Sequence, residues 1–297
     1  MTIKKEEKCP LCAGQSGLHF KSKDYNRAIT NETFNHYRCL KCKVIFICPI
    51  PKNLGKYYPN AYYSIPNSLP ELKSRFVDES FKIEIIHKFV KKGRLLEIGP
   101  SFGSFALLAK HSGFDVELIE QDAKCSSFLN DIVKIPTVNS DDPCNALKSL
   151  SSFDVITLWH VIEHVPNPFE LIEAIATRLN SNGIVVIATP NPNAFSFKLS
   201  RHFWPHLDAP RHLALIPSEA IIEKFKSLGI KLEHVTSKGK GSLKYNIFGL
   251  SFISNLSRNP IIKSLLKIIF GLAVILLYPI EKLEGKGSCY TVVLRKI

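Results

Sequence analysis

The stretch Arg94–Lys110 constrains the fold of this chain more than any other. It is a short apolar run that reaches Glu97, turns through Gly99 and Gly103, and continues as a helix. A buried parallel strand that enters a helix through a glycine turn forms the nucleotide-binding corner of a doubly wound α/β fold. Glycines let the backbone approach a ligand closely, and the helix N-terminus offers unpaired N–H groups beside it.

Strand and helix patterns alternate after this corner, which indicates βαβ units. The predicted fold class is therefore α/β, with a doubly wound, mostly parallel sheet of seven strands. We predict these strands at Arg94–Ile98, Asp115–Glu120, Ile135–Val138, Phe153–Leu158, Gly183–Ala188, Ile230–Thr236 and Cys289–Arg295. Helices are predicted at Leu72–Lys91, Phe169–Leu179 and Ser218–Ser227, with Ser218 as the N-cap of the last.

Composition describes a globular protein: the chain has 297 residues, of which 45% are hydrophobic and 22% charged. The formal net charge of +13 suggests a nucleic-acid or anionic-membrane partner. However, Lys and Arg are scattered, which favours a solvated surface. The charged start, Met1–Lys8, lacks the apolar run of a secretory signal, so we expect a cytoplasmic protein.

Four of the eight cysteines form two Cys-x-x-Cys pairs. Cys9 and Cys12 make one pair, and Cys39 and Cys42 make the other after 26 intervening residues, enough for a hairpin. Four thiolates complete the tetrahedral shell that suits zinc, and a closed site of this kind is structural. We therefore predict a zinc ribbon over residues 1–50, the alternative being unrelated buried thiols. Its strands are expected at Phe34–Arg38 and Val44–Ile47.

Residues 51–71 form a linker rich in Pro and Tyr, since prolines at this density break regular structure. The pairs Tyr57-Tyr58 and Tyr62-Tyr63 either cover a ligand or pin the linker to the next domain. Both interpretations stay open. The main domain is predicted over 72–297.

A hydrophobic helical insertion, residues 237–288, separates the last two predicted strands. It contains Ile261–Ile280, whose longest uninterrupted apolar part is shorter than the ~20 residues of a membrane-spanning helix. Three interpretations are open: a core or dimer helix, a helix in the membrane plane, and a lid over an apolar pocket. Lys263 and Lys267 lie one turn apart on one face, as interfacial helices place them. Peripheral membrane contact through 243–283 is therefore one expectation.

The glycine turn does not match the nicotinamide fingerprint G-x-G-x-x-G, because Ser101 stands between Gly99 and Gly103. An acid directly before the turn, Glu97, repels a pyrophosphate and suits a cation or ammonium group. These residues match the first motif of class I S-adenosylmethionine-dependent methyltransferases, with Ser101 in place of the middle glycine. The chain resembles that family.

The resemblance implies a Rossmann-like methyltransferase domain that binds S-adenosylmethionine. Glu97 and the turn Gly99–Gly103, with Ser101, are expected to hold the methionine end of the cofactor. Glu120 ends the second strand, and it is expected to chelate the ribose hydroxyls, with Gln121 beside it. Asp141 or Asp142 stands where the family often contacts adenine.

The segment Phe153–Pro166 is similar to the one that follows the fourth strand in methyltransferases related to ubiquinone-biosynthesis O-methyltransferases. This similarity places Trp159 and His160 beside the cofactor, and Glu163 and His164 near the substrate mouth. His160-x-x-Glu163-His164 is also formally an inverted zinc-protease motif. Prolines follow it at once and exclude the long helix that a protease needs, whereas a catalytic divalent metal stays an alternative.

A loop rich in histidine, Arg201–His212, follows the fifth strand at the sheet edge where α/β enzymes place substrate. Methyl transfer to a hydroxyl needs an in-line acceptor and a base for its proton. His206 and His212 are the candidate bases, and His164 is a third candidate catalytic residue. The alternative is that the loop is only structural.

The implied function is methyl transfer from S-adenosylmethionine to a hydroxyl of a small-molecule, glycan or lipid-linked acceptor. One alternative is a nucleic-acid methyltransferase that docks through the ribbon and the basic surface. No Asn-Pro-Pro-Tyr-type motif follows the fourth strand, so a nucleic-acid partner is disfavoured. A second alternative is a non-catalytic binding module at the membrane periphery.

Overall fold

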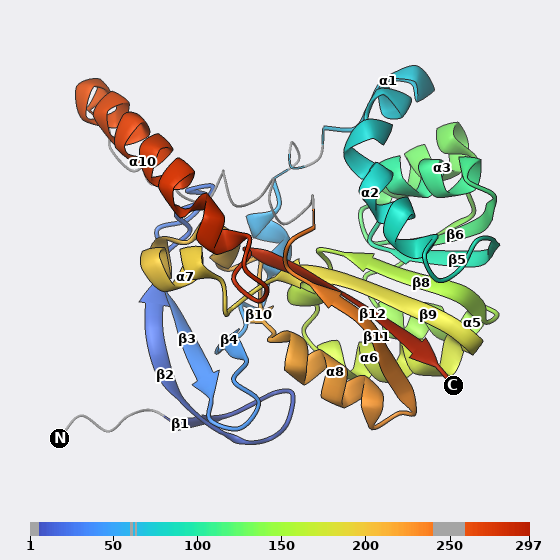
Figure 1. The fold of residues 1–297 in the computed structure, drawn as a ribbon, viewed down its shortest axis with the longest axis horizontal. Coiled ribbons are helices and arrows are strands. Elements are labelled where there is room, and N and C mark those ends of the chain that lie inside the picture. The colour runs from blue at the N-terminus through green and yellow to red at the C-terminus, as the bar shows by residue number, and fades with distance from the viewer. Residues whose placement is uncertain (1–5, 60–61, 63, 240–258) are drawn as a thin grey trace.

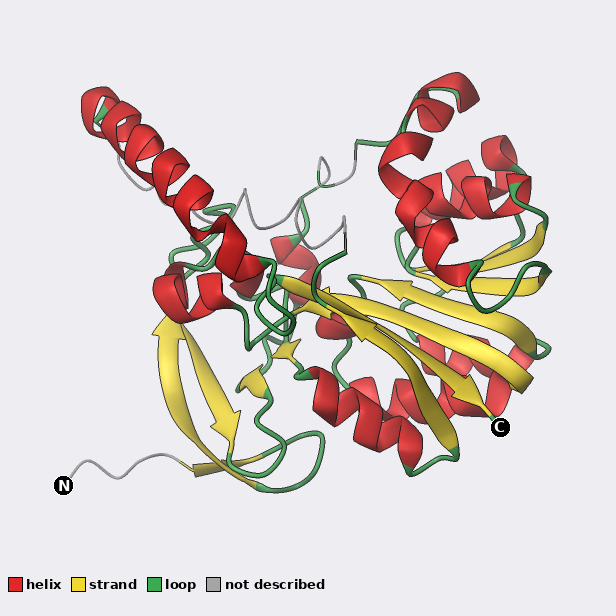
Figure 2. Cartoon of the chain, viewed as in Figure 1, coloured by secondary structure: helices red, strands yellow, loops and turns green. Residues whose placement is uncertain are grey.

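The computed structural model describes residues 6–59, 62, 64–239 and 259–297. Its large sheet consists of β5 (Gly93–Ile98), β6 (Phe114–Glu120), β7 (Thr137–Asn139), β8 (Phe153–Trp159), β9 (Leu179–Pro190), β11 (Ile230–Thr236) and β12 (Cys289–Lys296). The strand order is β11-β12-β9-β8-β5-β6-β7. The strands from β9 to β7 run parallel, and β12 lies antiparallel between β9 and β11. This confirms the predicted seven-stranded, mostly parallel α/β fold (Figure 2).

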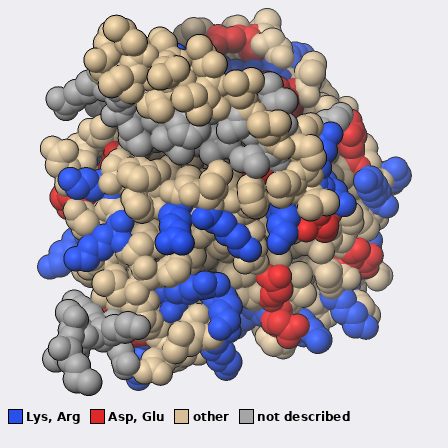
Figure 3. Space-filling view, turned by 60° about the vertical axis from the view of Figure 1, so that its left-hand side comes forward, with Lys and Arg blue, Asp and Glu red and all other residues tan. Residues whose placement is uncertain are grey.

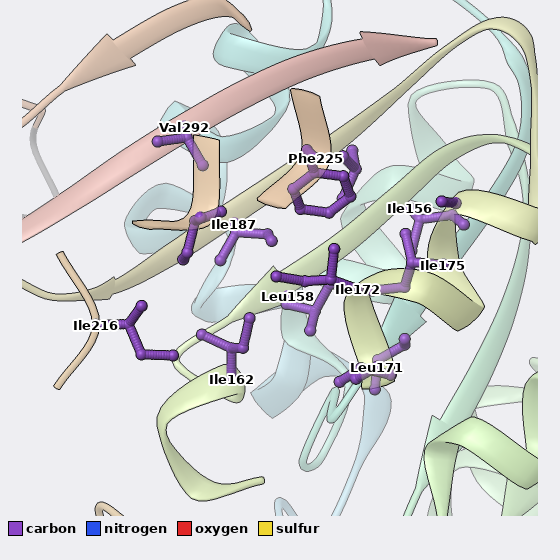
Figure 4. Packing of buried hydrophobic residues seen from close by; sticks show 14 of the residues in the cluster. Ile156, Leu158, Ile162, Leu171, Ile172, Ile175, Ile187, Ile216, Phe225 and Val292 are labelled. Atoms are coloured by element: carbon purple, nitrogen blue, oxygen red, sulfur yellow. The ribbon is translucent and has the colours of Figure 1, made fainter. Parts of the chain in front are cut away.

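Helices cover both faces of the sheet, because successive residues of its strands point to opposite sides. The helices of the described residues, including α10, which projects away from the sheet, are α1 (Leu69–Ser74), α2 (Phe76–Ile86), α3 (Ser104–His111), α4 (Ala123–Phe128), α5 (Pro143–Ser149), α6 (Pro168–Arg178), α7 (Phe195–Ser200), α8 (Ser218–Lys226) and α10 (Pro260–Glu281). On one face, Leu158 of β8 packs with Leu171 of α6 and Phe225 of α8 (Figure 4). On the other, Leu95 of β5 packs with residues of α2 and α3.

The N-terminal residues form a second sheet of five strands in the order β1-β2-β3-β4-β10. Its strands are β1 (Glu6–Lys8), β2 (Gln15–Ser22), β3 (Phe34–Cys39), β4 (Ile45–Ile47) and β10 (Ala214–Leu215). The strand β10 comes from the main domain and pairs antiparallel with β4, with Ala214 opposite Phe46. Tyr37 and Phe46 share one buried cluster with Ile216 and the α6 face of the large sheet. The N-terminal sheet is therefore built into the body of the protein.

Some predicted boundaries were wrong. The predicted helix Leu72–Lys91 is two helices, because α1 begins after its N-cap Ser68 and ends at Ser74, and α2 begins at Phe76 after the shared cap residue Arg75. The hydroxyl of Ser218 does not cap α8: Pro217, extended and without an N–H, occupies the cap position. The third strand begins at Thr137, directly after Pro136, rather than at Ile135.

Part of the predicted insertion, residues 240–258, lies outside the described residues. The helix α10 forms the described part and continues through Pro279. Among the described residues, no helix is long and apolar enough to cross a membrane.

Candidate active site

The glycine turn after β5 adopts left-handed backbone conformations at three positions. The φ angles are 70° at Gly99, 55° at Ser101 and 83° at Gly103. A Cβ atom on Gly103 would lie 2.3 Å from Cδ2 of Leu129, so a side chain there would require the buried Leu129 side chain to move. Ser101 keeps the conformation that glycine prefers, at a cost of ~1 kcal/mol for a non-glycine residue. Ser101 therefore differs from the glycine of the family motif in its side chain, whereas its backbone keeps the left-handed conformation that the turn needs.

Glu120 lies at the carboxyl end of β6, next to this turn. Its carboxylate accepts hydrogen bonds from the backbone N–H of Ser101 (2.9 Å) and of Asp122 (2.8 Å). Burial raises the pKa of Glu120 to about 7, although these backbone hydrogen bonds act in the opposite direction. A carboxylate offers about four lone-pair positions, so acceptor capacity remains for hydroxyl groups. The residue fits the ribose-binding role that the resemblance implies.

Glu97 and Trp159 lie on the sheet face that α2 and α3 cover. Glu97 is buried, and its Oε2 atom has no hydrogen-bond partner among the described residues. Burial raises the pKa of this carboxyl group to about 8. The Trp159 ring packs edge-on against Phe105, with 5.5 Å between ring centroids. An unpartnered buried carboxyl group fits a cationic ligand group, such as the ammonium group of a methionine moiety.

A cavity of about 480 Å³ opens at the carboxyl ends of β5, β6 and β8. Ligand sites in α/β proteins lie at this edge and have this size. The predicted residues that line it are Gly99, Glu120, Gln121, His160, His164, Asp141 and Asp142. The predicted residues that are not among its lining are Glu97, Ser101, Gly103, Trp159, His206 and His212.

Tyrosines of the linker form part of the cavity wall. Tyr58 and Tyr62 line the cavity, and their rings lie 4.9 Å apart. The hydroxyl group of Tyr58 lies 3.1 Å from Nδ1 of His164. Tyr57 is instead fully buried against Phe34, and Tyr63 lies outside the described residues. The linker thus both covers the cavity and anchors itself to the N-terminal sheet.

Glu163 and His212 lie next to His164 of the cavity wall, with one ligand atom of each of the three within 4.8 Å of the others. Nδ1 of His164 lies 2.9 Å from the carbonyl oxygen of Arg211, and Nδ1 of His212 lies 2.7 Å from that of His206. A carbonyl oxygen only accepts, so each Nδ1 donates the hydrogen bond, and in a neutral imidazole of this tautomer the lone pair lies on Nε2. Such a set of donors suits a base, or the alternative of a divalent cation.

His164 is neutral at physiological pH. Burial and the neighbouring His212 lower the pKa of its imidazole to about 4. Glu163 is buried behind it and accepts a hydrogen bond from the Thr189 hydroxyl at 2.9 Å. Of the three histidines proposed as catalytic, only His164 is among the residues that line the cavity. The ring of His206 packs against Trp204, with 5.0 Å between centroids.

A buried ion network holds this end of the cavity and was not predicted. The guanidinium group of Arg211, 1% exposed, donates to Asp24 (2.7 Å) and to Asp208 (2.9 and 2.7 Å). These hydrogen bonds hold the pKa of the Asp208 carboxyl group well below its usual range, although burial acts in the opposite direction. Because the carbonyl group of Arg211 orients His164, the network links the N-terminal sheet to the candidate base. Asp24 carries no sequence signal for this contact.

The four cysteines of the two Cys-x-x-Cys pairs come together. Their sulfur atoms lie 3.6 Å apart for Cys9 and Cys42, 3.5 Å for Cys12 and Cys39, and 3.4 Å for Cys12 and Cys42. A tetrahedral zinc site with ~2.3 Å bonds has sulfur–sulfur edges of ~3.8 Å, close to these distances. The two loops are also alike, since Ala13 and Lys43 each follow a second cysteine with positive φ. This donor set fits a zinc ion.

Comparison with known proteins agrees with this geometry. Residues 71–235, more than half of the chain, match the methyltransferase domain family. The chain is 28% identical to the ubiquinone biosynthesis O-methyltransferase of Paraburkholderia phymatum over 144 residues, 47% of this chain and 59% of the relative. It is 31% identical to the protein of that name from Glaesserella parasuis over 85 residues, 29% of this chain and 36% of the relative. The chain thus spans less than two thirds of either relative.

Solved structures share the fold. A SAM-dependent methyltransferase from Archaeoglobus fulgidus aligns with a TM-score of 0.51 at 21% identity, covering 75% of this chain and 94% of that one. The geranyl diphosphate C-methyltransferase of Streptomyces coelicolor gives 0.51 at 11% identity, covering 81% and 89%. At these identities the likeness concerns the fold alone. The family match over residues 71–235, joined to this fold, establishes that the chain belongs to the methyltransferase domain family.

Proposed function

We propose that this protein transfers a methyl group from S-adenosylmethionine to a hydroxyl group of a small-molecule acceptor. The observation that carries the proposal is one cavity that joins the buried acid Glu120 to the neutral imidazole of His164. Family membership supports the cofactor, and the printed names of the relatives, O-methyltransferases of ubiquinone biosynthesis, support a hydroxyl acceptor. Neither the family match nor the names of these relatives supports the nucleic-acid alternative.

Each cofactor-binding role falls to a residue whose chemistry suits it. Glu120 would accept from the two ribose hydroxyls, with Gln121 beside it on the cavity wall. The turn of Gly99, Ser101 and Gly103 lets the ligand approach the backbone closely. Glu97 would offer its unpartnered oxygen to the methionine ammonium group. When bound, the cofactor supplies an electrophilic methyl group on a sulfonium.

The acceptor side needs a base, and we assign this role to His164. Its Nε2 would take the hydroxyl proton, while the Nδ1–H group stays bonded to the Arg211 carbonyl oxygen. The tyrosine wall of Tyr58 and Tyr62 would exclude water and stack on a flat or apolar acceptor. The side chains that line this end of the cavity determine whether the acceptor is a free small molecule, a glycan or a lipid-linked molecule.

The His164→Gln variant tests the assignment of the base. We expect kcat to fall by a factor of about 10²–10⁴, with cofactor affinity unchanged, because glutamine cannot accept the proton. The measurement is S-adenosylhomocysteine formation with a panel of phenolic, sugar and polyprenyl-linked hydroxyl acceptors. His111→Gln, at an exposed position on α3, is the matched control. Equal kcat in both variants would exclude His164 as the base.

We also propose that Cys9, Cys12, Cys39 and Cys42 bind one structural zinc ion. The expected metal content is one zinc per chain by inductively coupled plasma mass spectrometry, and none in Cys39→Ser/Cys42→Ser. Cys144→Ser, outside the cluster, is the control and should keep its zinc. If the Cys39→Ser/Cys42→Ser variant still contains a bound metal ion, Glu163, His164 and His212 are the residues that would bind it.

A further inference from the structure

The helix α10 projects from the body of the protein. Figure 1 shows it extending outward on the left, with its C-terminal end near α7. It packs against α7, and its last residue, Glu281, is buried. The body therefore holds one end of this 22-residue helix.

The outer face of α10 is apolar. Seven of its large apolar side chains are between 48% and 78% exposed: Ile261, Ile262, Leu265, Ile268, Ile269, Leu272 and Leu276. At about 100° per residue, all seven fall within an arc of about 120°. We call them the α10 stripe. Lys263 and Lys267 lie on the opposite side of the helix. In the first half of the helix, an exposed apolar face is thus opposed by two lysines, as in a helix that lies in a membrane surface.

Exposed basic residues lie on α7, which contacts the base of α10, and on elements that pack next to it. Lys198 of α7 and Arg201 of the adjoining 3-10 helix η4 (Arg201–Phe203) are exposed, and β2, which packs against η4, carries exposed Lys21. Figure 3 brings this side forward: residues other than Lys, Arg, Asp and Glu make up most of the top of the face, and Lys and Arg outnumber Asp and Glu on its lower left. The side of the protein from which α10 projects therefore carries exposed basic residues.

We infer that the α10 stripe docks the protein onto an anionic lipid bilayer. A second copy of the chain is the competing occupant, but each copy carries a formal net charge of +13, and two such bodies repel one another. An anionic bilayer surface attracts the basic residues and offers an apolar layer for the stripe. This inference is independent of the proposed methyl transfer.

Vesicle co-sedimentation of the full-length protein tests it. The variant is Ile268→Glu/Leu272→Glu, in the centre of the stripe. The control is Val77→Glu/Leu232→Glu, which adds the same charge at exposed apolar positions on α2 and β11 (84% and 43% exposed). With vesicles of equal phosphatidylglycerol and phosphatidylcholine, we expect the variant to bind about a hundredfold more weakly, because each lost apolar side chain costs about tenfold. The control should bind like the wild type.

Binding should also weaken with salt and on pure phosphatidylcholine vesicles, because the basic residues contribute. Equal partition of wild type and variant would overturn the inference. The inference would also be overturned if the wild type bound no vesicles. Sedimentation velocity would then show whether the wild type is a dimer through the α10 stripe and whether the variant is a monomer. Circular dichroism confirms folding, and Ile268→Ser/Leu272→Ser replaces the glutamate variant if that variant does not fold.

Discussion

At the scale of single residues, the acid before the glycine turn is buried without a full set of hydrogen bonds. Glu97 has a pKa raised to about 8 by burial, above its ordinary value of 4.5, and its Oε2 has no partner among the described residues. The native state therefore keeps a proton that the unfolded chain releases, so the free energy of unfolding falls as pH rises from about 4.5 to about 8. Glu97 therefore lowers the stability of the folded protein at the upper end of this pH range, which is consistent with a role in ligand binding.

Glu97→Gln tests this pH dependence. Glutamine does not titrate, so between pH 6 and 8 the free energy of unfolding should change by about 2 kcal/mol less than in the wild type. Urea denaturation at both pH values measures the difference. Glu117→Gln, on the neighbouring strand β6, should keep the pH dependence of the wild type. Identical pH dependence in all three proteins would refute the raised pKa of Glu97.

At the scale of elements, the strands of the large sheet were predictable and its connections to the N-terminal sheet were not. Apolar runs and the glycine turn indicated β5, β6 and β8, because buried parallel strands are continuously hydrophobic. The two-residue strand β10 leaves no periodic pattern, and its pairing with β4 joins segments far apart in the chain. The contact of Asp24 with Arg211 spans 187 positions for the same reason. Glu120 and His164 were predicted from family motifs, and the cavity that joins them required the structure.

The Asp24→Asn variant tests that long-range contact. It removes one of the two carboxylates that compensate the buried guanidinium group, and breaking a buried ion pair costs about 3 kcal/mol. We expect a loss of this size in the free energy of unfolding, together with a lower kcat, because the Arg211 carbonyl group orients His164. Asp115→Asn, at an exposed position on β6, is the control. Unchanged stability and kcat would show that the network does not hold the site.

At the scale of the whole molecule, the N-terminal sheet, the linker and the methyltransferase domain form one site. The linker supplies Tyr58 and Tyr62 to the cavity wall, and the N-terminal sheet holds the loop of Arg211 through Asp24. The buried cluster runs without a break from Tyr37 to the large sheet. The segments predicted as 1–50 and 51–71 therefore pack against the main domain, and their boundaries stay a prediction.

The central claim is that the cavity binds S-adenosylmethionine through Glu120. Calorimetric titration with S-adenosylhomocysteine tests it most directly, because this product binds without turnover. We predict that Glu120→Gln raises Kd by about thirtyfold, the worth of hydrogen bonds to one charged group. Glu117→Gln, three residues earlier on the same strand, should bind like the wild type. Equal Kd values for Glu120→Gln and the wild type would contradict the account.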